Sequence, residues 1–238
     1  MKKFIICSSS FIILLFYSSC KKDQPIITPD LGYNYFPSQV GRYIIYDVDS
    51  IVHDDFTLTV DTFKYQVKEL IDSIYLDNSN RPTLQIKRYR KNYNNKVPYS
   101  SIPWTLKNLW FANRTNTSAE KVEENQRFIK LVFPVIKNRA WNGNAANTLD
   151  EWEYKFTDVD IARTLAGINF DSTAFVKQID NETLIDKKYF VEIYAKNVGM
   201  IYKKIIDVKS FTITPLPIMK RISSGIEYKM TINSYGIN

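Results

Sequence analysis

The sequence predicts a mainly β, exported domain built from antiparallel meanders. Three observations support this fold class. Short runs of β-branched and aromatic residues are separated by Asn, Asp, Pro and Ser, and no long helical period is present. The chain has 238 residues, 45% of them hydrophobic, which is enough for a packed core. It has only 7 Gly, so Asn, Asp and Pro must make most of its turns. We expect curved sheets, a sandwich or a half-barrel, with few short helices.

The N-terminus has the features of an export signal. Basic Met1-Lys2-Lys3 precedes an apolar run over 4–17 that is too short to span a bilayer comfortably. The next residues, Tyr17-Ser18-Ser19-Cys20, resemble a bacterial lipobox, in which the signal is cut before the cysteine and its thiol receives diacylglycerol. Tyr17 departs from the aliphatic residue commonest at its position, and an ordinary secretory signal is the alternative. We expect a signal peptide over 1–19 and lipid attachment at Cys20.

A short tether is expected to follow over 20–32. The segment Lys21-Lys22-Asp23-Gln24-Pro25 is polar, and Pro29 follows, so the chain reads as an extended linker. Removal of the signal takes away Cys7 and two lysines, which lowers the formal charge from +7 to +5 and leaves no pair of cysteines for a disulfide. The start Cys-Lys-Lys-Asp resembles Bacteroidota-type lipoproteins. That resemblance implies an outer-membrane location, with the cell surface slightly favoured over the periplasmic face.

The remaining chain, 33–238, is predicted to form one all-β domain. The expected strands are 43–48, 56–60, 63–71, 84–89, 128–135, 153–156, 174–179, 189–195, 200–208, 211–214 and 226–232. Short helices are expected at 161–165 and 119–126. Asn197-Val198-Gly199 predicts a hairpin turn in which Gly takes a positive φ.

Two pairs of similar segments suggest an internal duplication. Phe36-Pro37 precedes Arg42 as Phe133-Pro134 precedes Arg139, and Tyr89-Arg-Lys-Asn92 parallels Tyr194-Ala-Lys-Asn197. The shifts are 97 and 105 residues, which predicts related halves at 33–127 and 128–238. Coincidence in a chain rich in Tyr, Asn and Lys is the alternative. Because Pro lacks the N–H that a central ladder needs, each Phe-Pro is expected to begin or end an edge strand.

Three segments together resemble a family of uncharacterised Bacteroidota-type lipoproteins. They are Tyr35-Phe-Pro-Ser-Gln-Val-Gly-Arg-Tyr43, the stretch from Phe133-Pro134 to Trp141-Asn-Gly-Asn144, and Tyr194-Ala-Lys-Asn-Val-Gly-Met-Ile-Tyr202. The resemblance implies a mostly β exported domain with no known activity, so it provides no catalytic or binding residue.

The composition excludes most enzyme classes. No two glycines lie close enough to form a phosphate-binding loop, and one histidine, His53, cannot form the usual zinc sites. We therefore expect no cofactor and no metal. Asp54 and Asp55 could orient His53 as a base, but His-Asp-Asp also fits a polar hairpin turn, which we favour. The acids Asp150, Glu151, Glu153, Asp158 and Asp160 surround Trp152 and leave a carboxylate-based glycoside hydrolase as an alternative.

Several side chains are candidates for binding or modification. Four tryptophans could stack on sugar rings, although indoles more commonly fill cores: Trp104, Trp110, Trp141 and Trp152. The basic stretch 87–93 is expected to be a solvated edge strand, with Ile86, Arg88 and Arg90 on one face. Asp-Ser-Ile and Asp-Ser-Thr tripeptides resemble Bacteroidota-type O-glycosylation acceptors, which implies Ser50, Ser73 and Ser172 as sites.

These observations predict a non-catalytic, lipid-anchored envelope protein. Its expected partners are the membrane, through the lipidated N-terminus, and a glycan or an envelope protein, and nucleic acid is not expected. A carrier of lipids or other hydrophobic molecules is the second hypothesis and requires an apolar cavity lined from both halves. The hydrolase is the third and requires two acids facing each other across a cleft.

Overall fold

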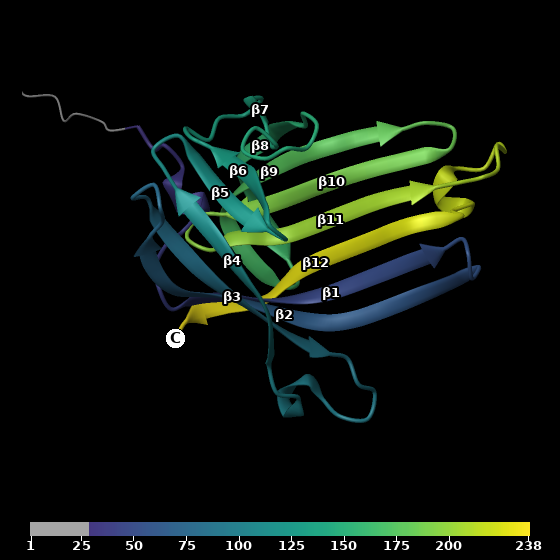
Figure 1. Cartoon of the computed structure of the whole chain (residues 1–238), viewed down its shortest axis with the longest axis horizontal. Helices are drawn as coiled ribbons and strands as arrows, with labels where there is room; N and C mark the ends of the chain where they lie inside the picture. The colour runs from purple at the N-terminus through teal and green to yellow at the C-terminus, as the bar shows by residue number, and fades with distance from the viewer. Residues whose placement is uncertain (1–28) are drawn as a thin grey trace, which may run out of the picture.

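Twelve strands form a single antiparallel sheet in the computed structural model (Figure 1). The strands are β1 (Arg42–Asp54), β2 (Thr59–Leu76), β3 (Pro82–Asn92), β4 (Thr105–Arg114), β5 (Ser118–Glu123), β6 (Gln126–Val132), β7 (Ala140–Asn142), β8 (Glu153–Leu165), β9 (Ile168–Glu182), β10 (Asp186–Ala195), β11 (Gly199–Lys209) and β12 (Ser224–Ile237). Three single 3-10 turns, η1 (Tyr33–Tyr35), η2 (Tyr99–Ser101) and η3 (Ile218–Lys220), are the helical elements of the described part. The predicted mainly β, antiparallel fold is confirmed.

The structure describes residues 29–238. The expected signal peptide, the lipid site at Cys20 and most of the tether lie outside the described residues. Within them, no helix is both long and apolar enough to cross a membrane.

The sheet consists of two six-stranded meanders joined at its centre. The strand order is β6-β5-β4-β3-β2-β1-β12-β11-β10-β9-β8-β7. We call β1–β6 the first arm and β7–β12 the second arm. The first and last strands pair along most of their length, from Arg42 opposite Ile237 to His53 opposite Gly225. The two edges of the sheet are therefore β6 and β7.

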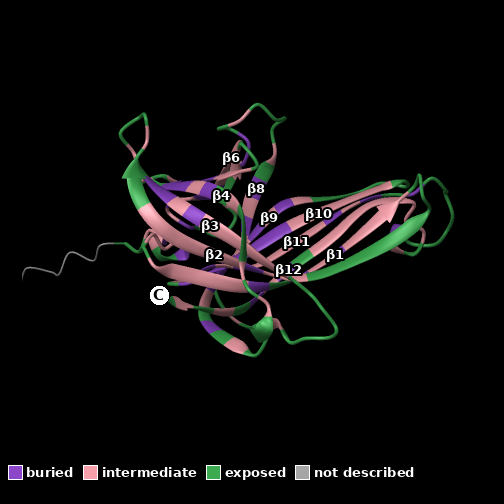
Figure 2. Ribbon diagram, turned by 60° about the horizontal axis from the view of Figure 1, so that its bottom comes forward, coloured by how far each residue is buried: buried purple, intermediate pink, exposed green. Residues whose placement is uncertain are grey.

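The sheet curls until these edges almost meet, which makes a nearly closed barrel (Figure 2). Residues 133–139 carry the chain from β6 to β7. The indole Nε1 of Trp141 donates a hydrogen bond to the carbonyl of Ile129 at 2.8 Å. The amide of Ile129 donates to the carbonyl of Gly143 at 2.9 Å. These bonds satisfy edge groups that an open sheet would expose.

The core follows the curvature of the sheet. One cluster fills the region beside the closing seam and contains Leu131, Phe133, Tyr154 and Phe156. A second cluster includes Tyr46, Val67, Ile193 and Met230 near the central strands. The residues of β10 from Val191 to Ala195 are all buried, so both faces of this strand are covered there.

Both predicted helices are wrong. Residues 161–165 belong to β8, where Arg163 pairs with Phe170 and Leu165 with Ile168. Residues 118–123 form β5, whose side chains alternate between buried and half-buried positions at its start. In each case cross-strand pairing outweighs a weak local helical preference.

Two predicted strands are also wrong over most of their length. Residues 55–58 form the turn between β1 and β2, where Asp54 Oδ1 accepts hydrogen bonds from the amides of Phe56 and Thr57. The polar turn expected at His53-Asp54-Asp55 is confirmed in part: Asp55 begins the turn, whereas His53 and Asp54 end β1 and pair with β2. Residues 211–214 lie in the long loop between β11 and β12. In both places the apolar residues that suggested a strand are exposed to solvent.

The expectation of an edge strand at 87–93 is wrong as well, because β3 lies between β2 and β4. The prediction that each Phe-Pro lies at an edge strand is wrong for Phe36-Pro37, which precedes the central strand β1. It is confirmed for Phe133-Pro134, which follows the edge strand β6. The hairpin at Asn197-Val198-Gly199 is confirmed, with φ of 63° at Asn197 and 107° at Gly199.

The boundary expected between the halves, after residue 127, falls inside β6. Tyr89–Asn92 ends β3, the third strand of the first arm, whereas Tyr194–Asn197 ends β10, the fourth strand of the second arm. The second pair of similar segments therefore occupies different places in the two arms. The internal duplication stays a prediction.

Candidate functional site

Seven charged side chains meet inside the barrel, and we call them the interior charge network. They are Glu69 on β2, Arg88 on β3, Lys121 and Glu123 on β5, Lys130 on β6, Glu192 on β10 and Lys203 on β11. The first five come from the first arm and the last two from the second arm. Charged side chains are rarely placed in an interior without partners, so their arrangement defines the candidate site.

Two contacts of the network cross the interior between strands that are not neighbours in the sheet, Lys130 to Glu192 and Lys203 to Glu123. Lys130 Nζ lies 2.6 Å from Glu192 Oε1, and Lys203 Nζ lies 3.3 Å from the same oxygen. Glu123 approaches the same two lysines, at 3.8 Å from Lys130 and 3.6 Å from Lys203. Two carboxylates and two ammonium groups therefore alternate and connect the two arms.

A second branch of the network lies within the first arm. Lys121 Nζ is 2.9 Å from Glu69 Oε2 and 3.7 Å from Glu123 Oε1. Arg88 Nε is 3.3 Å from Glu69 Oε1. The indole ring of Trp110 lies between these two cations, 4.2 Å from the Arg88 guanidinium and 4.6 Å from Lys121 Nζ. Trp110 thus supports both cations through cation–π contacts.

Mutual attraction keeps the network ionised. Burial by itself would raise the pKa of Glu123 and of Glu192, but the positive charges of Lys130 and Lys203 outweigh it and hold both pKa values below their ordinary range. Burial would lower the pKa of Lys130 and Lys203, and the carboxylates reverse this effect and raise both. By formal charge the network contains four cations and three carboxylates, a surplus of one positive charge.

Glu192 is the centre of the network. Its side chain has no exposed surface, and besides the two lysines it accepts a hydrogen bond from the Tyr194 hydroxyl at 2.6 Å. Burial and the nearby carboxylate raise the pKa of Tyr194 well above its ordinary value, so this hydroxyl stays a donor. A buried carboxylate with three donors is well solvated by the protein.

A cavity of about 80 Å³ lies beside the network. Its polar wall includes Glu69, Lys121, Glu123 and Lys130 from the network, together with Arg42. Its apolar wall comes from both arms: Phe36, Pro37, Ile44, Ile71, Leu84 and Ile86 precede or belong to the first arm, and Val198 and Met200 belong to the second. The Nε atom of Arg42 is buried and has no hydrogen-bond partner among the described residues. The cavity therefore offers apolar surface next to three cations and two carboxylates.

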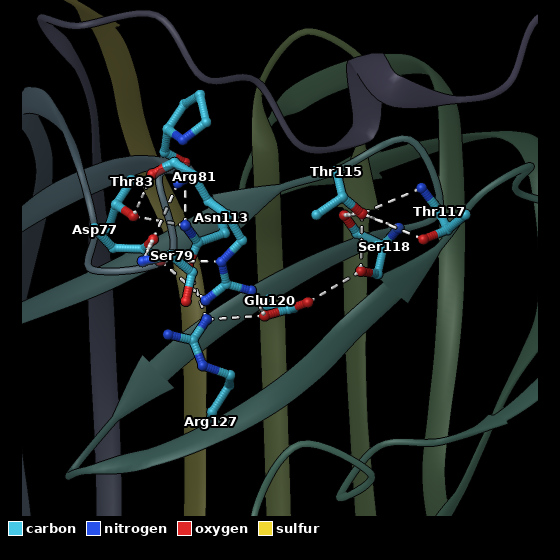
Figure 3. Close-up of polar contacts among 11 residues, drawn as sticks. Asp77, Ser79, Arg81, Thr83, Asn113, Thr115, Thr117, Ser118, Glu120 and Arg127 are labelled. Carbon is cyan, nitrogen blue, oxygen red and sulfur yellow. Dashed lines mark hydrogen bonds and ion pairs between the residues drawn. The ribbon is translucent and has the colours of Figure 1, made fainter.

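A second polar cluster holds the turns at one end of the first arm (Figure 3). Glu120 Oε2 lies 2.8 Å from Arg127 and 3.4 Å from Arg81, and Arg81 also pairs with Asp77 at 2.9 Å. The buried amide of Asn113 donates to Thr83 Oγ1 at 2.6 Å and accepts from Arg127. Every charged group in this cluster has a partner of opposite charge, so it explains turn stability and offers no vacant ligand position.

The four tryptophans singled out by the sequence lie in three places. Trp141 and Trp152 pack against the cluster beside the closing seam. Trp110 is buried in a different cluster. Trp104 lies in the loop before β4, with Lys91 Nζ 4.3 Å from its ring centre. Their packing roles account for the first three, and glycan binding by any of them stays a prediction.

The proposed O-glycosylation sites differ in their surroundings. Ser50 on β1 is buried, and Ser73 on β2 is half-buried. Ser172 donates to Asp160 Oδ1 at 2.7 Å and shares a second hydrogen bond with the Tyr35 hydroxyl. Modification of these three serines stays a prediction, and at Ser50 it would have to precede folding because the hydroxyl lies within the sheet.

Three of the remaining polar candidates, His53, Asp158 and Asp160, have structural partners. His53 Nε2 lies 3.1 Å from Glu227 Oε1 on the neighbouring strand. Asp158 pairs with Arg163, and Asp160 pairs with Lys196 at 2.6 Å. Among residues 29–238 no group of three His, Cys, Asp or Glu side chains is placed to hold a metal ion.

Sequence reasoning missed the interior charge network. One signal was available, because Glu192 interrupts the run Tyr-Phe-Val-Glu-Ile-Tyr-Ala and Lys130 interrupts Phe-Ile-Lys-Leu-Val. A charged residue within an apolar strand indicates a buried ion pair or a polar outer face. The sequence alone does not distinguish a buried ion pair from a polar outer face, because the fold determines which strand lies opposite the charged residue.

No family model and no curated protein matches this sequence. Two solved structures have a similar chain path. One is described as a "putative exported protein with YmcC-like fold" from Bacteroides fragilis NCTC 9343, with a TM-score of 0.45 and 10% identity, covering 84% of this chain and 98% of that chain. The other is a "putative lipoprotein" from Parabacteroides distasonis ATCC 8503, with a TM-score of 0.33 and 11% identity, covering 85% of this chain and 98% of that chain. At this identity no residue role is transferred.

Proposed function

We propose that this protein is a non-catalytic binding module of the cell envelope that takes the end of a small, negatively charged amphipathic molecule into its interior cavity. One observation carries the proposal: the cavity is lined by apolar side chains from both arms and ends at a charge network with a positive surplus. This is the arrangement that the second sequence-based hypothesis requires.

The apolar wall selects the hydrophobic part of the ligand. Phe36, Ile71, Leu84 and Met200 come from four separate segments and converge on the cavity. The volume of about 80 Å³ is roughly half of the ~150 Å³ in which an engineered protein cavity binds benzene. The enclosed part of the ligand is therefore short, such as one end of an acyl chain or a small ring, and the rest extends through the opening.

The charged wall selects the sign of the polar group. Lys121 and Lys130 line the cavity, and each already pairs with a carboxylate, so they attract a further anion only through the surplus charge of the network. Arg42 adds a cation whose Nε has no partner. A carboxylate or phosphate next to these groups would balance the charge, whereas an added cation would face repulsion.

The same electrostatics support binding rather than hydrolysis. A glycoside hydrolase needs one carboxylic acid that keeps its proton near neutral pH and a second that is ionised. Glu123 and Glu192 share Lys130 and Lys203 as ion-pair partners in the interior, and the pKa values of both are lowered by these lysines. Neither is suited to donate a proton to a leaving group.

The binding test uses a fluorescent fatty acid and two matched variants of β2. Ile71→Trp fills the cavity, whereas Ile74→Trp places the same side chain at an exposed position on the same strand. We expect saturable binding to wild type and to Ile74→Trp, and an affinity at least about tenfold weaker in Ile71→Trp, equivalent to about 1.4 kcal/mol. A fatty alcohol of equal length should displace the probe less well than the fatty acid.

Two results would contradict the proposal. The first is the absence of saturable binding to a wild-type protein whose folding is verified by circular dichroism. The second is an equal affinity in the two tryptophan variants, which would place the probe outside the cavity.

The envelope location rests on the lipobox. Metabolic labelling with an alkyne fatty acid should modify the wild-type chain and not Cys20→Ala. Labelling that persists in Cys20→Ala would argue against acylation at this cysteine.

A further inference from the structure

One end of the barrel presents apolar side chains to solvent. Three loops meet there: the β1–β2 turn (55–58), the β9–β10 turn (183–185) and the β11–β12 loop (210–223), which lie together at the right of Figure 1. Of the seven most exposed large apolar side chains in residues 29–238, six lie on or directly beside these loops: Phe56, Leu58, Val60, Leu184, Phe211 and Ile213. We call these six residues the apolar tips.

Hydrogen bonds join the β9–β10 turn to the β11–β12 loop, and a shared hollow places the β1–β2 turn beside that loop. Arg221 Nη2 donates to the carbonyl of Leu184 at 2.7 Å, and its Nε donates to the carbonyl of Leu216 at 2.9 Å. The amide of Ser210 donates to the carbonyl of Ile185 at 2.8 Å. Leu58, Val60 and Phe211 line a common hollow between the β1–β2 turn and the β11–β12 loop. The tips are therefore held in a fixed arrangement.

The fold accepts backbone strain to present one of these side chains. Leu58 has a φ of 54°, in the left-handed region that non-glycine residues rarely adopt, and its side chain is 86% exposed. Its neighbour Phe56 is 94% exposed. Local conflicts between sequence pattern and structure are typical of functional sites, and both mispredicted strands, 56–60 and 211–214, lie at this end.

We propose that the apolar tips dock the barrel onto a lipid bilayer. The six side chains project from three turns, and a fluid surface can receive separate projections without a preformed pocket for each. The segment from Lys209 to Arg221 contains three basic residues and no acid, and Lys209 and Lys220 are exposed. Lys209 lies two residues before Phe211, and Lys220 lies in the same loop as Phe211 and Ile213. Headgroup phosphates would contact these two lysines, whereas Asp54 and Asp55 beside Phe56 would have to face away from the bilayer.

The expected tether permits this contact. The described chain begins near the opposite end of the barrel (Figure 1), where Asp30 pairs with Lys196. Nine residues lie between Cys20 and Asp30, and the ten Cα–Cα steps of a fully extended chain span at most about 35 Å. The 18 residues of β2 span roughly 60 Å. A lipid at Cys20 therefore holds the barrel close enough for it to incline and bring the tips to the same membrane.

The lipid at Cys20 and the apolar tips would reinforce each other, because attachment through the lipid raises the effective concentration of the tips at the membrane. The contact of the tips can then be weak by itself and still fix the orientation of the barrel. This inference is independent of the ligand proposed for the interior cavity.

The test measures the environment of single cysteines in the full, lipid-anchored chain. The signal removes Cys7 and acylation blocks Cys20, so a cysteine introduced at Leu58 or Ile213 is the sole labelling site. Leu76, at the other end of β2, is equally apolar and 65% exposed, close to the 68% of Ile213, and provides the matched control position. Each variant is labelled with an environment-sensitive nitrobenzoxadiazole dye and reconstituted on phosphatidylcholine or phosphatidylcholine/phosphatidylglycerol vesicles.

We expect the dye at positions 58 and 213 to shift its emission to shorter wavelength and to be quenched by doxyl-labelled lipids, while the dye at position 76 reports water. Adding Phe56→Asp and Phe211→Asp should abolish the shift at position 213, whereas adding Leu76→Asp should not. Dyes at 58 and 213 that report water on both vesicles would overturn the proposal. A shift that appears only after envelope proteins are added would also overturn it and indicate a protein partner.

Discussion

Replacing Glu192 with Gln tests whether the interior charge network holds the two arms together. The substitution keeps the size of the side chain and removes one buried negative charge. Lys130 and Lys203 lose their closest partner, at 2.6 and 3.3 Å, and keep only Glu123, at 3.8 and 3.6 Å. The surplus positive charge of the network rises from one to two.

The expected loss of stability is large because the position is closed to solvent. Removing one partner of a buried ion pair typically costs about 3–5 kcal/mol, since the remaining charge stays buried without compensation. The side chain of Glu192 has no exposed surface and that of Lys130 only 4%, so water cannot screen the change. We expect about 4 kcal/mol, or a fall in Tm of roughly 8–16 °C for a chain of this length.

Chemical unfolding followed by circular dichroism measures this difference. The matched control is Asp49→Asn, which removes a carboxylate from the exposed pair with Lys229, 2.9 Å apart with side chains 40% and 50% exposed. Its cost should stay below about 1 kcal/mol. Lys130→Met combined with Glu192→Gln removes one charge of each sign, so the double variant should be more stable than the sum of the single effects. A loss in Glu192→Gln no greater than in Asp49→Asn, or additive effects in the double variant, would refute the reasoning.

Three further predictions concern pH, a glycine and the closing seam. Because the folded protein lowers the pKa of Glu123 and Glu192 below the usual value of 4.5, their stabilisation is present above about pH 4.5 and is lost as the pH falls through the folded values. Glu192→Gln should therefore flatten the acid limb of a plot of unfolding free energy against pH, and an unchanged limb would contradict this. Gly225 has a φ of 119°, and a Cβ there would lie 2.1 Å from the carbonyl oxygen of Asp207. Gly225→Ala should thus lose at least about 3 kcal/mol in urea unfolding, against about 1 kcal/mol for Gly167→Ala, where nothing lies within 4 Å. Trp141→Phe removes the indole donor to Ile129 and should cost about 1–2 kcal/mol; hydrogen exchange at the Ile129 amide should accelerate, and unchanged exchange would show that the seam does not depend on this bond.

The fold class could be predicted from the sequence because its signal is local. Runs such as 43–48 and 200–208 are rich in β-branched and aromatic residues, and they form the cores of β1 and β11. The same local rule fails at 56–60 and 211–214, where apolar residues lie in loops. Composition alone does not distinguish an apolar residue that packs in a core from one that faces an external partner.

The candidate site could not be predicted because it depends on contacts distant in the sequence. Lys130 and Glu192 are 62 residues apart and lie on opposite arms. Their contact follows from the curl of the sheet, which is set by β1–β12 pairing and by the seam between Trp141 and Ile129. No pattern within either strand specifies that closure. The alternation of side chains along a strand correctly predicted that Arg88 shares a face with the buried Ile86 and with Arg90. The sequence could not show that this face is the barrel interior.

The energetics of buried ions bear on what the network is for. Well-packed apolar residues can replace a buried ion pair with little loss of stability, so stability alone does not explain four cations and three carboxylates inside a barrel. The proposed ligand site gives a reason for keeping charged side chains in the interior that stability alone does not give. Lys121 and Lys130 line the cavity and are also part of the network that connects the arms. A bound anion would pull on these lysines and weaken their hold on Glu123 and Glu192. Under the proposed function, occupancy of the cavity would therefore be coupled to the contacts between the arms, and an apolar interior of equal stability would have no such coupling.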